Sequence, residues 1–286
     1  MRIGVRPGSG FPPWLLGGTR VLAAGVLLIL IALILRRRTR LTTTQTWALA
    51  LSGILIWVTG HGVLLWAEQW ADSGYAALFI ASFPLWAALY DAGIDRVRPS
   101  GRLIASLVAG FAGIVLLMLP ELRSAGGLSP LVLFGLVIAP ITWAAGFTIQ
   151  KRHVRGVDPL VSAAYQHLAA MPLFFVVAFA AGEPTPDPIA EAWLAWGYLV
   201  VFGSVFAFTA AHVALNRLPV RIAMTYGYVN PVVAVALGHV VLSEPITVWT
   251  LGGAGLVLVG VYGVFRDRGL PTGAQVASAA AVRGGS

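Results

Sequence analysis

The sequence predicts an all-α protein that crosses a membrane many times. Of its 286 residues, 58% are hydrophobic and only 10% are charged, and the mean hydropathy is +0.84. Soluble domains carry roughly 25% charged residues. The apolar residues gather in nine continuous runs, each near the ~20 residues that a helix needs to cross the hydrocarbon of a bilayer. The loops between these runs alternate in charge, as they do in multi-pass membrane proteins.

The nine expected helices are separated by short segments rich in turn-forming residues, such as RVRPSG and GEPTPDP. They cover residues 14–35, 47–67, 74–91, 102–120, 129–150, 159–181, 190–214, 219–242 and 247–265. A membrane barrel would instead show alternating strands of about ten residues. Because the runs are continuous, helices are favoured. Residues 267–286 are expected to form a disordered cytoplasmic tail.

The basic residues predict the orientation of the chain. Of the 19 Lys and Arg residues, 15 lie in the loops after the first, third, fifth and seventh runs, at the very start of the fourth and eighth runs, or in the segment after the ninth. The alternate loops carry acidic residues and only one arginine, Arg123. Because Lys and Arg collect on the cytoplasmic side, we expect a cytoplasmic C-terminus. The cell inner membrane is the expected location of the protein.

The start of the chain departs from this pattern. Nine spans put the N-terminus outside, with Arg2 and Arg6 on the side that basic residues avoid. The opening MRIGVRPGSGFPP has no apolar stretch of the kind a secretory signal peptide requires. Either a nine-span form is real or a first helix is missing from this chain.

The sequence also contains a weak internal repeat with an offset of 147 residues. Over residues 76–113 the offset superposes four identical pairs, which are Ala76 with Ala223, Pro84 with Pro231, Ala87 with Ala234 and Gly113 with Gly260. By the charge pattern, the related helices 74–91 and 219–242 cross the membrane in opposite directions. Inverted repeats with interrupted helices at matching positions are typical of secondary transporters. We expect a first repeat over 1–120 and an inverted second repeat over 121–266.

Proline interrupts both repeats near the middle of a span. Pro84 and Pro231 each remove one helical hydrogen bond, and Gly227 supplies the carbonyl that Pro231 frees. Irregular backbone at membrane depth is tolerated where it is buried in protein or lines a wet cavity. Pro84, Gly227 and Pro231 are therefore expected hinge positions, with simple packing as the alternative.

The segment GYLVVFGSVFAFTAAHVALNRLPVRIAMTYGYVNPVVAVALGHVVLSEPIT resembles the second repeat of the EamA-type drug/metabolite transporters. SGYAALFIASFPLWAAL with GFAGIVLLMLP resembles the end of the first repeat, and PPWLLGGTRVLAAGVLLIL resembles the family's second helix with its arginine, here Arg20. The resemblance implies ten helices in two inverted five-helix repeats, and export of small metabolites or amino acids through a central cavity. MRIGV resembles only the tail of the family's first helix.

The expected substrate site lies near the midplane, at the interface of the repeats. Its candidate lining residues are polar or aromatic side chains inside spans, namely Trp57, His61, Phe79, Phe83, Trp143, Ser204, Tyr226 and Asn230. A histidine at membrane depth is a functional candidate, although His61 as a neutral side chain bonded to a backbone carbonyl is an alternative. Asn230 bonded to a neighbouring helix, and aromatic stripes that only pack, are further alternatives.

Three further features lie within the expected spans. Arg20 is a basic residue inside a span, and near the outer end its head group is expected to snorkel to water. His212 lies near the cytoplasmic end of its span and is a weaker functional candidate than His61. Ala105, Ala109 and Gly113 recur every four residues and predict a close helix contact.

The sequence thus predicts a secondary transporter, an exporter of small metabolites or amino-acid-like compounds that works by alternating access. No motif of a zinc protease, serine hydrolase or ATP-driven pump is present, so no catalytic residues, metal or cofactor are expected. The expected partners are a small-molecule substrate and the lipid bilayer, without nucleic acid; a homodimer is a further expectation. The rival readings are a lipid-acting enzyme that uses Asp91 and Asp95, and a non-transporting membrane subunit.

Overall fold

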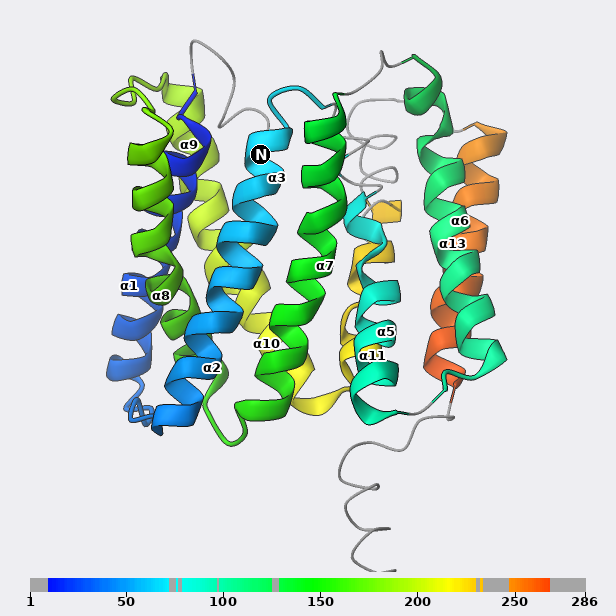
Figure 1. The fold of residues 1–286 in the computed structure, drawn as a ribbon, viewed down its shortest axis with the longest axis horizontal. Coiled ribbons are helices and arrows are strands. Elements are labelled where there is room, and N and C mark those ends of the chain that lie inside the picture. The colour runs from blue at the N-terminus through cyan, green and yellow to red at the C-terminus, as the bar shows by residue number, and fades with distance from the viewer. Residues whose placement is uncertain are drawn as a thin grey trace, which may run out of the picture. The chain divides into compact units, whose positions relative to one another are not determined.

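The computed structural model describes residues 10–71, 76, 79–96, 98–124, 129–229, 232–233 and 247–267, and the regular elements within these ranges are all helices (Figure 1). By its contacts the chain divides into two compact units. The first unit comprises Met1–Ile80 and Ala125–Leu218, and the second comprises Ala81–Ser124 and Pro219–Ser286.

The first unit contains α-helices together with two wider π-helical segments, which are labelled η. Its elements are α1 (Pro13–Ile34), α2 (Thr43–Gly53), η1 (Ile54–Gly62), α3 (Val63–Ala67), α7 (Pro130–His153), α8 (Pro159–Ala180), α9 (Ala190–Tyr198), η2 (Leu199–Phe206) and α10 (Ala207–Arg217). The second unit holds α5 (Phe83–Asp95), α6 (Gly101–Ser124), α11 (Val220–Ala223) and α13 (Val248–Arg266).

Six helical stretches of the described chain are long and apolar enough to cross a membrane. They are Pro13–Ile34, Thr43–Ala67, Pro130–His153, Pro159–Ala180, Ala190–Arg217 and Val248–Arg266, and Gly101–Leu117 forms a shorter apolar helix. The prediction of a polytopic all-α fold is confirmed. The expected spans 74–91 and 219–242 lie partly outside the described residues.

The second stretch begins a turn earlier than its hydropathy predicts, at Thr43 and not at Trp47. Thr42 accepts a hydrogen bond from the backbone N–H of Gln45, whose side chain accepts one from the backbone N–H of Thr42. This capping box satisfies N–H groups that a helix start leaves unpaired. Local polar chemistry, which hydropathy does not register, therefore sets this boundary.

In the first unit, α1 packs closely along α8 because glycines face large side chains. A Cβ built on Gly17 would lie 2.2 Å from the Phe174 ring, and one on Gly25 would lie 2.8 Å from the Leu168 side chain. As the contact moves forward along α1 it moves backward along α8, so the two helices run antiparallel. A larger side chain at either glycine would separate them.

The basic loops of the first unit lie together at one end. The connection between α1 and α2 meets the one between α7 and α8, where the Arg37 guanidinium lies 3.4 Å from the Asp158 carboxylate. Tyr165 also donates a hydrogen bond to the Thr39 carbonyl, at 3.2 Å. At the other end of α1, Glu183 accepts hydrogen bonds from the backbone N–H groups of Trp14 and Leu15, at 2.9 and 2.8 Å. An acidic loop thus caps the opposite end of the helix.

The two π-helical segments occupy related positions in the sequence. The offset of 147 moves residues 54–62 onto 201–209, and η2 spans Leu199–Phe206. Both lie within spans that the repeat pairs with each other, Thr43–Ala67 and Ala190–Arg217. π-Helical turns are rare and are frequently found at functional sites. Because such segments occur at related positions of the sequence, the part of the first unit around η1 and η2 is a candidate functional site.

In the second unit, α6 and α13 run antiparallel in backbone contact (Figure 1). A Cβ on Gly260 would lie 2.5 Å from the backbone nitrogen of Gly110, and one on Gly113 would lie 2.7 Å from that of Val257. The 147-residue offset pairs Gly110 with Val257 and Gly113 with Gly260, so it converts each of these contacts into the other. A two-fold axis between the two helices would have the same effect. The predicted close contact is present, but its face differs, because Ala105 is exposed.

The helix containing Pro84 is interrupted just before it. Residues 79–81 are helical, Ser82 forms a turn, and α5 begins at Phe83 with Pro84 in its first turn, where a missing N–H is tolerated. Near Gly227 the chain turns at 224–225 and resumes as a helix at 226–229. The predicted hinge residue Pro231 lies outside the described residues.

Candidate functional site

A cluster of aromatic rings surrounds Trp57 inside the first unit. Trp57, in η1, is 1% exposed. Its ring centroid lies 4.4 Å from that of His61, 4.2 Å from that of His167 on α8, and 4.8 Å from that of Phe208 on α10. His61 in turn meets Trp143 of α7 at 4.0 Å. Four helical spans therefore converge on one buried tryptophan.

Arg20 of α1 joins this cluster with its charged head. The side chain is 2% exposed, its Nε donates a hydrogen bond to the Ser204 Oγ at 2.9 Å, and its guanidinium carbon lies 5.0 Å from the Trp57 ring centroid. The expectation that Arg20 snorkels to water is therefore wrong. α1 packs against both η1 and η2, so the side chain points into the unit, where Ser204 and the Trp57 ring hold it.

Several polar atoms of the cluster have no hydrogen-bond partner among the described residues. They are Arg20 Nη1, Trp57 Nε1 and His167 Nε2, all buried. The other ring nitrogen of His167 lies 2.7 Å from the Ala163 carbonyl oxygen. Buried polar groups are normally paired, so these atoms can each bond to a polar ligand or to water.

His61 has both of the properties that its sequence context suggested. Its side chain is 6% exposed and stacks on Trp57. Its Nδ1 also lies 3.2 Å from the Ile56 carbonyl oxygen, five residues earlier, a carbonyl brought within reach by the wider π turn. The carbonyl-bonded alternative is thus the observed arrangement, within the same aromatic cluster.

The repeat offset relates members of this cluster to one another. Moving 147 residues along the chain pairs Arg20 with His167, Trp57 with Ser204, and His61 with Phe208. The hydrogen bond between Arg20 and Ser204 therefore has a symmetry-related counterpart. It is the contact between Trp57 and His167, whose ring centroids are 4.2 Å apart. The offset thus relates contacts within the cluster to one another, as an internal repeat would.

A second buried polar group adjoins the aromatic cluster. Gln166 of α8 donates through Nε2 to the Ser52 Oγ at 2.7 Å and to the Gln150 Oε1 at 3.0 Å, and its Oε1 lies 2.9 Å from His212 Nε2. His212 Nδ1 lies 2.8 Å from the Phe208 carbonyl oxygen. Ser52, Gln150, Gln166 and His212 are all at most 2% exposed. This network ties together α2, α7, α8 and α10.

Sequence reasoning missed His167 and Gln166 and gave His212 little weight. The adjacent pair Gln166–His167 in the middle of an apolar run is the signal that could have found them, since polar residues at membrane depth are rare and functional. The repeat offset is a second signal, because it places His167 opposite Arg20.

The structure gathers four of the predicted site residues, Trp57, His61, Trp143 and Ser204, into the first unit's cluster. Two others, Phe83 and Tyr226, meet in the second unit with ring centroids 5.5 Å apart. Phe79 packs against a separate apolar cluster formed by α3, α7 and their neighbours. Asn230 lies outside the described residues.

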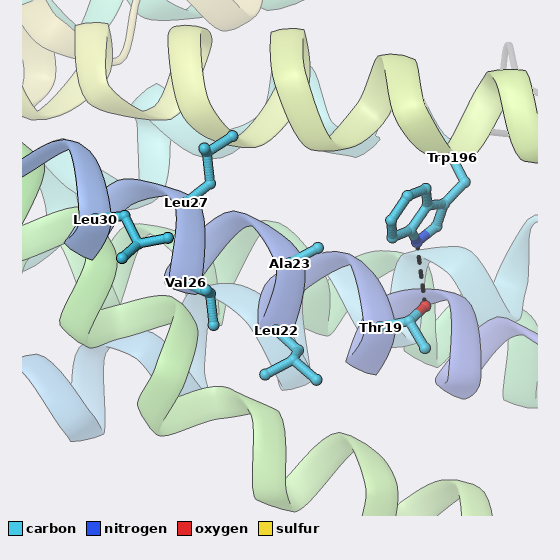
Figure 2. Close-up of a pocket in the computed structure, with 7 residues that line it drawn as sticks. All are labelled: Thr19, Leu22, Ala23, Val26, Leu27, Leu30 and Trp196. Carbon is cyan, nitrogen blue, oxygen red and sulfur yellow. Dashed lines mark hydrogen bonds between the residues drawn. The ribbon is translucent and has the colours of Figure 1, made fainter.

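An open groove of about 440 Å³ runs along α1 beside Trp196 (Figure 2). Its walls are aliphatic apart from Thr19 and Trp196, and the Trp196 Nε1 donates a hydrogen bond to the Thr19 Oγ1 at 3.2 Å. Because these polar atoms are already paired and the other lining atoms are apolar, this surface suits contact with lipid tails. It offers no group that would orient a polar solute.

Within the described residues, no group of three or more His, Cys, Asp and Glu side chains is arranged to hold a metal ion. Asp91 and Asp95, the pair considered for a lipid-acting enzyme, lie one turn apart on α5. The Asp95 side chain is exposed. The chemistry available in the first unit's cluster is therefore hydrogen bonding, ring stacking and one buried positive charge.

Comparison with known proteins gives the family. The model of the EamA-like transporter family matches residues 3–119 and 130–266. The uncharacterized inner membrane transporter YedA of Escherichia coli (strain K12) is 34% identical over 243 residues, which cover 83% of this chain and 76% of that protein. An uncharacterized transporter of Archaeoglobus fulgidus is 24% identical over 231 residues, covering 78% of each chain.

A solved crystal structure has the same fold. It superposes with a TM-score of 0.73 at 22% sequence identity, over 88% of this chain and 86% of the other. Together with the apolar spans and the buried polar cluster, the family match over most of the sequence leads to one conclusion: this multi-pass membrane protein belongs to the EamA-like transporter family.

Proposed function

We propose that the protein is a secondary transporter that exports small metabolites or amino-acid-like compounds across the inner membrane by alternating access. The observation that carries the proposal is the buried cluster around Trp57, Arg20 and Ser204. It lies where both halves of the repeat contribute matching positions, and substrate sites of inverted-repeat transporters form at such interfaces.

The depth of the cluster supports the same proposal. Trp57 is near the middle of the span Thr43–Ala67, and Ser204 is near the middle of the span Ala190–Arg217. Both belong to π-helical segments, in which backbone hydrogen bonding departs from that of a regular helix. A polar, irregular level in mid-membrane is costly unless it lines a cavity or is buried in protein.

In this mechanism the cluster is accessible from one side of the membrane at a time, and the C-terminus is cytoplasmic. We propose that residues 1–120 and 121–266 are the two inverted repeats, and that the packing of α1 on α8 and of α6 on α13 is kept throughout. Pro84, Gly227 and Pro231 are the proposed hinges, because a helix start and a helix interruption lie beside the first two.

Efflux from proteoliposomes tests the proposal. Vesicles containing the purified chain are loaded with a defined mixture of the standard amino acids and small organic acids, and the external medium is analysed by mass spectrometry. We expect at least one compound to leave faster than from protein-free vesicles. Release of lipid head groups from the same vesicles would identify an enzyme, and neither activity would identify a non-transporting subunit.

A matched pair of variants links the flux to the cluster. Ser204→Leu fills the cluster with an apolar side chain and removes the Arg20 partner, so efflux should fall at least about tenfold. Phe202→Leu changes a neighbouring residue of η2 that is 53% exposed, and efflux should be unchanged. Equal flux in both variants would show that the transport site lies elsewhere.

A further inference from the structure

The charge of Arg20 is unbalanced within the first unit. Among the described residues of this unit, Arg20 is the only Arg, Lys, Asp or Glu whose side chain is buried, and it forms no ion pair with any described residue. Burying a charge costs several kcal/mol unless an opposite charge accompanies it. A buried arginine without an acidic partner among these residues can be stabilised by a bound anion.

The surroundings hold the guanidinium in one place and leave part of it available. Nε donates to Ser204 at 2.9 Å, and the group lies over the Trp57 ring. A Cβ at Gly203 would lie 2.9 Å from Nη2, so glycine at this position leaves room for the group. Nη1 has no hydrogen-bond partner among the described residues, and neither has Trp57 Nε1 beside it.

We propose that Arg20 binds the carboxylate of a small monoanionic substrate, with the Trp57 indole N–H as a second donor and the aromatic rings around it as the wall for the apolar part of the molecule. The inference rests on the proposed function and narrows its substrate class. One buried positive charge balances one negative charge, and the planar guanidinium matches the geometry of a carboxylate. Aromatic side chains supply apolar contact beside such polar groups.

Ligand-dependent protection against heat denaturation tests the proposal without requiring transport. The purified full chain in nanodiscs is heated with acetate, butyrate, benzoate or phenylacetate, and each acid is compared with its primary amide at equal ionic strength. We expect at least one acid to raise the melting temperature more than its amide does. Protection by no acid beyond its amide, or equal protection by sodium chloride, overturns the proposal.

Variants assign the effect to the cluster. Arg20→Gln should weaken the acid-specific protection at least about tenfold in apparent affinity. Arg155→Gln, which removes an exposed arginine at the end of the unit, should leave it unchanged. Trp57→Phe keeps an aromatic side chain and the Arg20 charge but replaces the indole by the smaller phenyl ring, which has no N–H donor, and should weaken the affinity roughly three- to tenfold.

Trp57→Phe also keeps the test decisive if Arg20→Gln fails to fold. If the acid binds Trp57→Phe and Arg20→Lys as tightly as the unaltered protein, the proposal is wrong. A protein that moves amino acids in the efflux assay but shows no protection specific to the monocarboxylic acids would keep the proposed transport function and lose this inference. Failure of the two ideas is thus distinguishable.

Discussion

Gln166 shows how one residue can bind several spans together inside a membrane. Its amide reaches Ser52, Gln150 and His212 on three other helices, and the four side chains are at most 2% exposed. Interhelical hydrogen bonds in membrane proteins average only about 0.6 kcal/mol each. The network matters more because removing its centre takes a hydrogen-bond partner from three buried polar groups at once.

We therefore expect Gln166→Leu to lower the free energy of unfolding by about 2–4 kcal/mol, as measured by unfolding in mixed micelles of increasing SDS fraction. Thr142→Ala is the matched control, because the Thr142 hydroxyl bonds only to the Ile138 and Ala139 carbonyls of its own helix. Its effect should stay below about 0.5 kcal/mol. A similar loss of unfolding free energy in both variants would mean that the interhelical network stabilises the protein no more than a hydrogen bond within one helix does.

Glu183 acts at the start of α1. Its carboxylate accepts the backbone N–H groups of Trp14 and Leu15, which a helix start otherwise leaves unpaired. Glu183→Ala should lower the free energy of unfolding by about 1 kcal/mol, measured in the same micelle titration. Glu191→Ala changes an exposed acid in the first turn of α9 and should have a smaller effect; a larger one would contradict the capping role.

At the scale of elements, the antiparallel pair α6 and α13 depends on glycine. Gly260→Ala would bring a Cβ to 2.5 Å from the Gly110 nitrogen and 2.7 Å from the Ser106 carbonyl oxygen, both of them backbone atoms that cannot turn aside. We expect a loss of about 1–3 kcal/mol. Gly255→Ala on the same helix meets nothing within 4 Å and should be neutral or stabilising by up to about 1 kcal/mol. Thermal unfolding in detergent compares the two, and equal melting temperatures would refute the close contact.

The π-helical segments also belong to this scale. Hydropathy predicted the spans that contain η1 and η2 and the correspondence between them, but nothing in the residue types marked a wider turn. A π turn costs hydrogen-bond quality locally and persists only where neighbouring packing compensates. That packing involves α1, α7 and α8, which are distant in sequence, so it could not be read from the segments themselves.

At the scale of the whole molecule, the alternation of loop charge predicts which loops face the cytoplasm. The protein has no cysteine, so single cysteines can be introduced without a prior cysteine-free variant. Arg38→Cys and Arg155→Cys, in the basic loops, should react with a membrane-impermeant maleimide only after the membrane is opened. Thr185→Cys, in the acidic loop, should react in intact cells. The reverse pattern would overturn the predicted orientation.

The inverted relation of the two halves has its own test at this scale. Arg98 follows the helix that contains Pro84, and Arg217 precedes the helix that contains Pro231. Single cysteines at both positions should be protected from the impermeant maleimide in intact cells, because the charge pattern places both loops on the cytoplasmic side. If only one cysteine is protected, the two helices cross the membrane in the same direction, and transport by two inverted repeats is contradicted.

The amino-acid sequence by itself determined the membrane class, the described spans to within a few residues and the family. These depend on average hydropathy, charge distribution and residue order, which are properties of the chain before it folds. It also supplied four members of the cluster, Trp57, His61, Trp143 and Ser204, because polar and aromatic residues stand out in apolar runs.

Tertiary structure alone decided which way these side chains face. Hydropathy gives the depth of a residue but not its side of the helix, so Arg20 was expected to reach for water and is instead held by Ser204 and Trp57. Gln166 found its partners on helices more than a dozen residues away in the chain. Such contacts form only when helices that are distant in the sequence pack against one another, and their energies depend on the distances reached there.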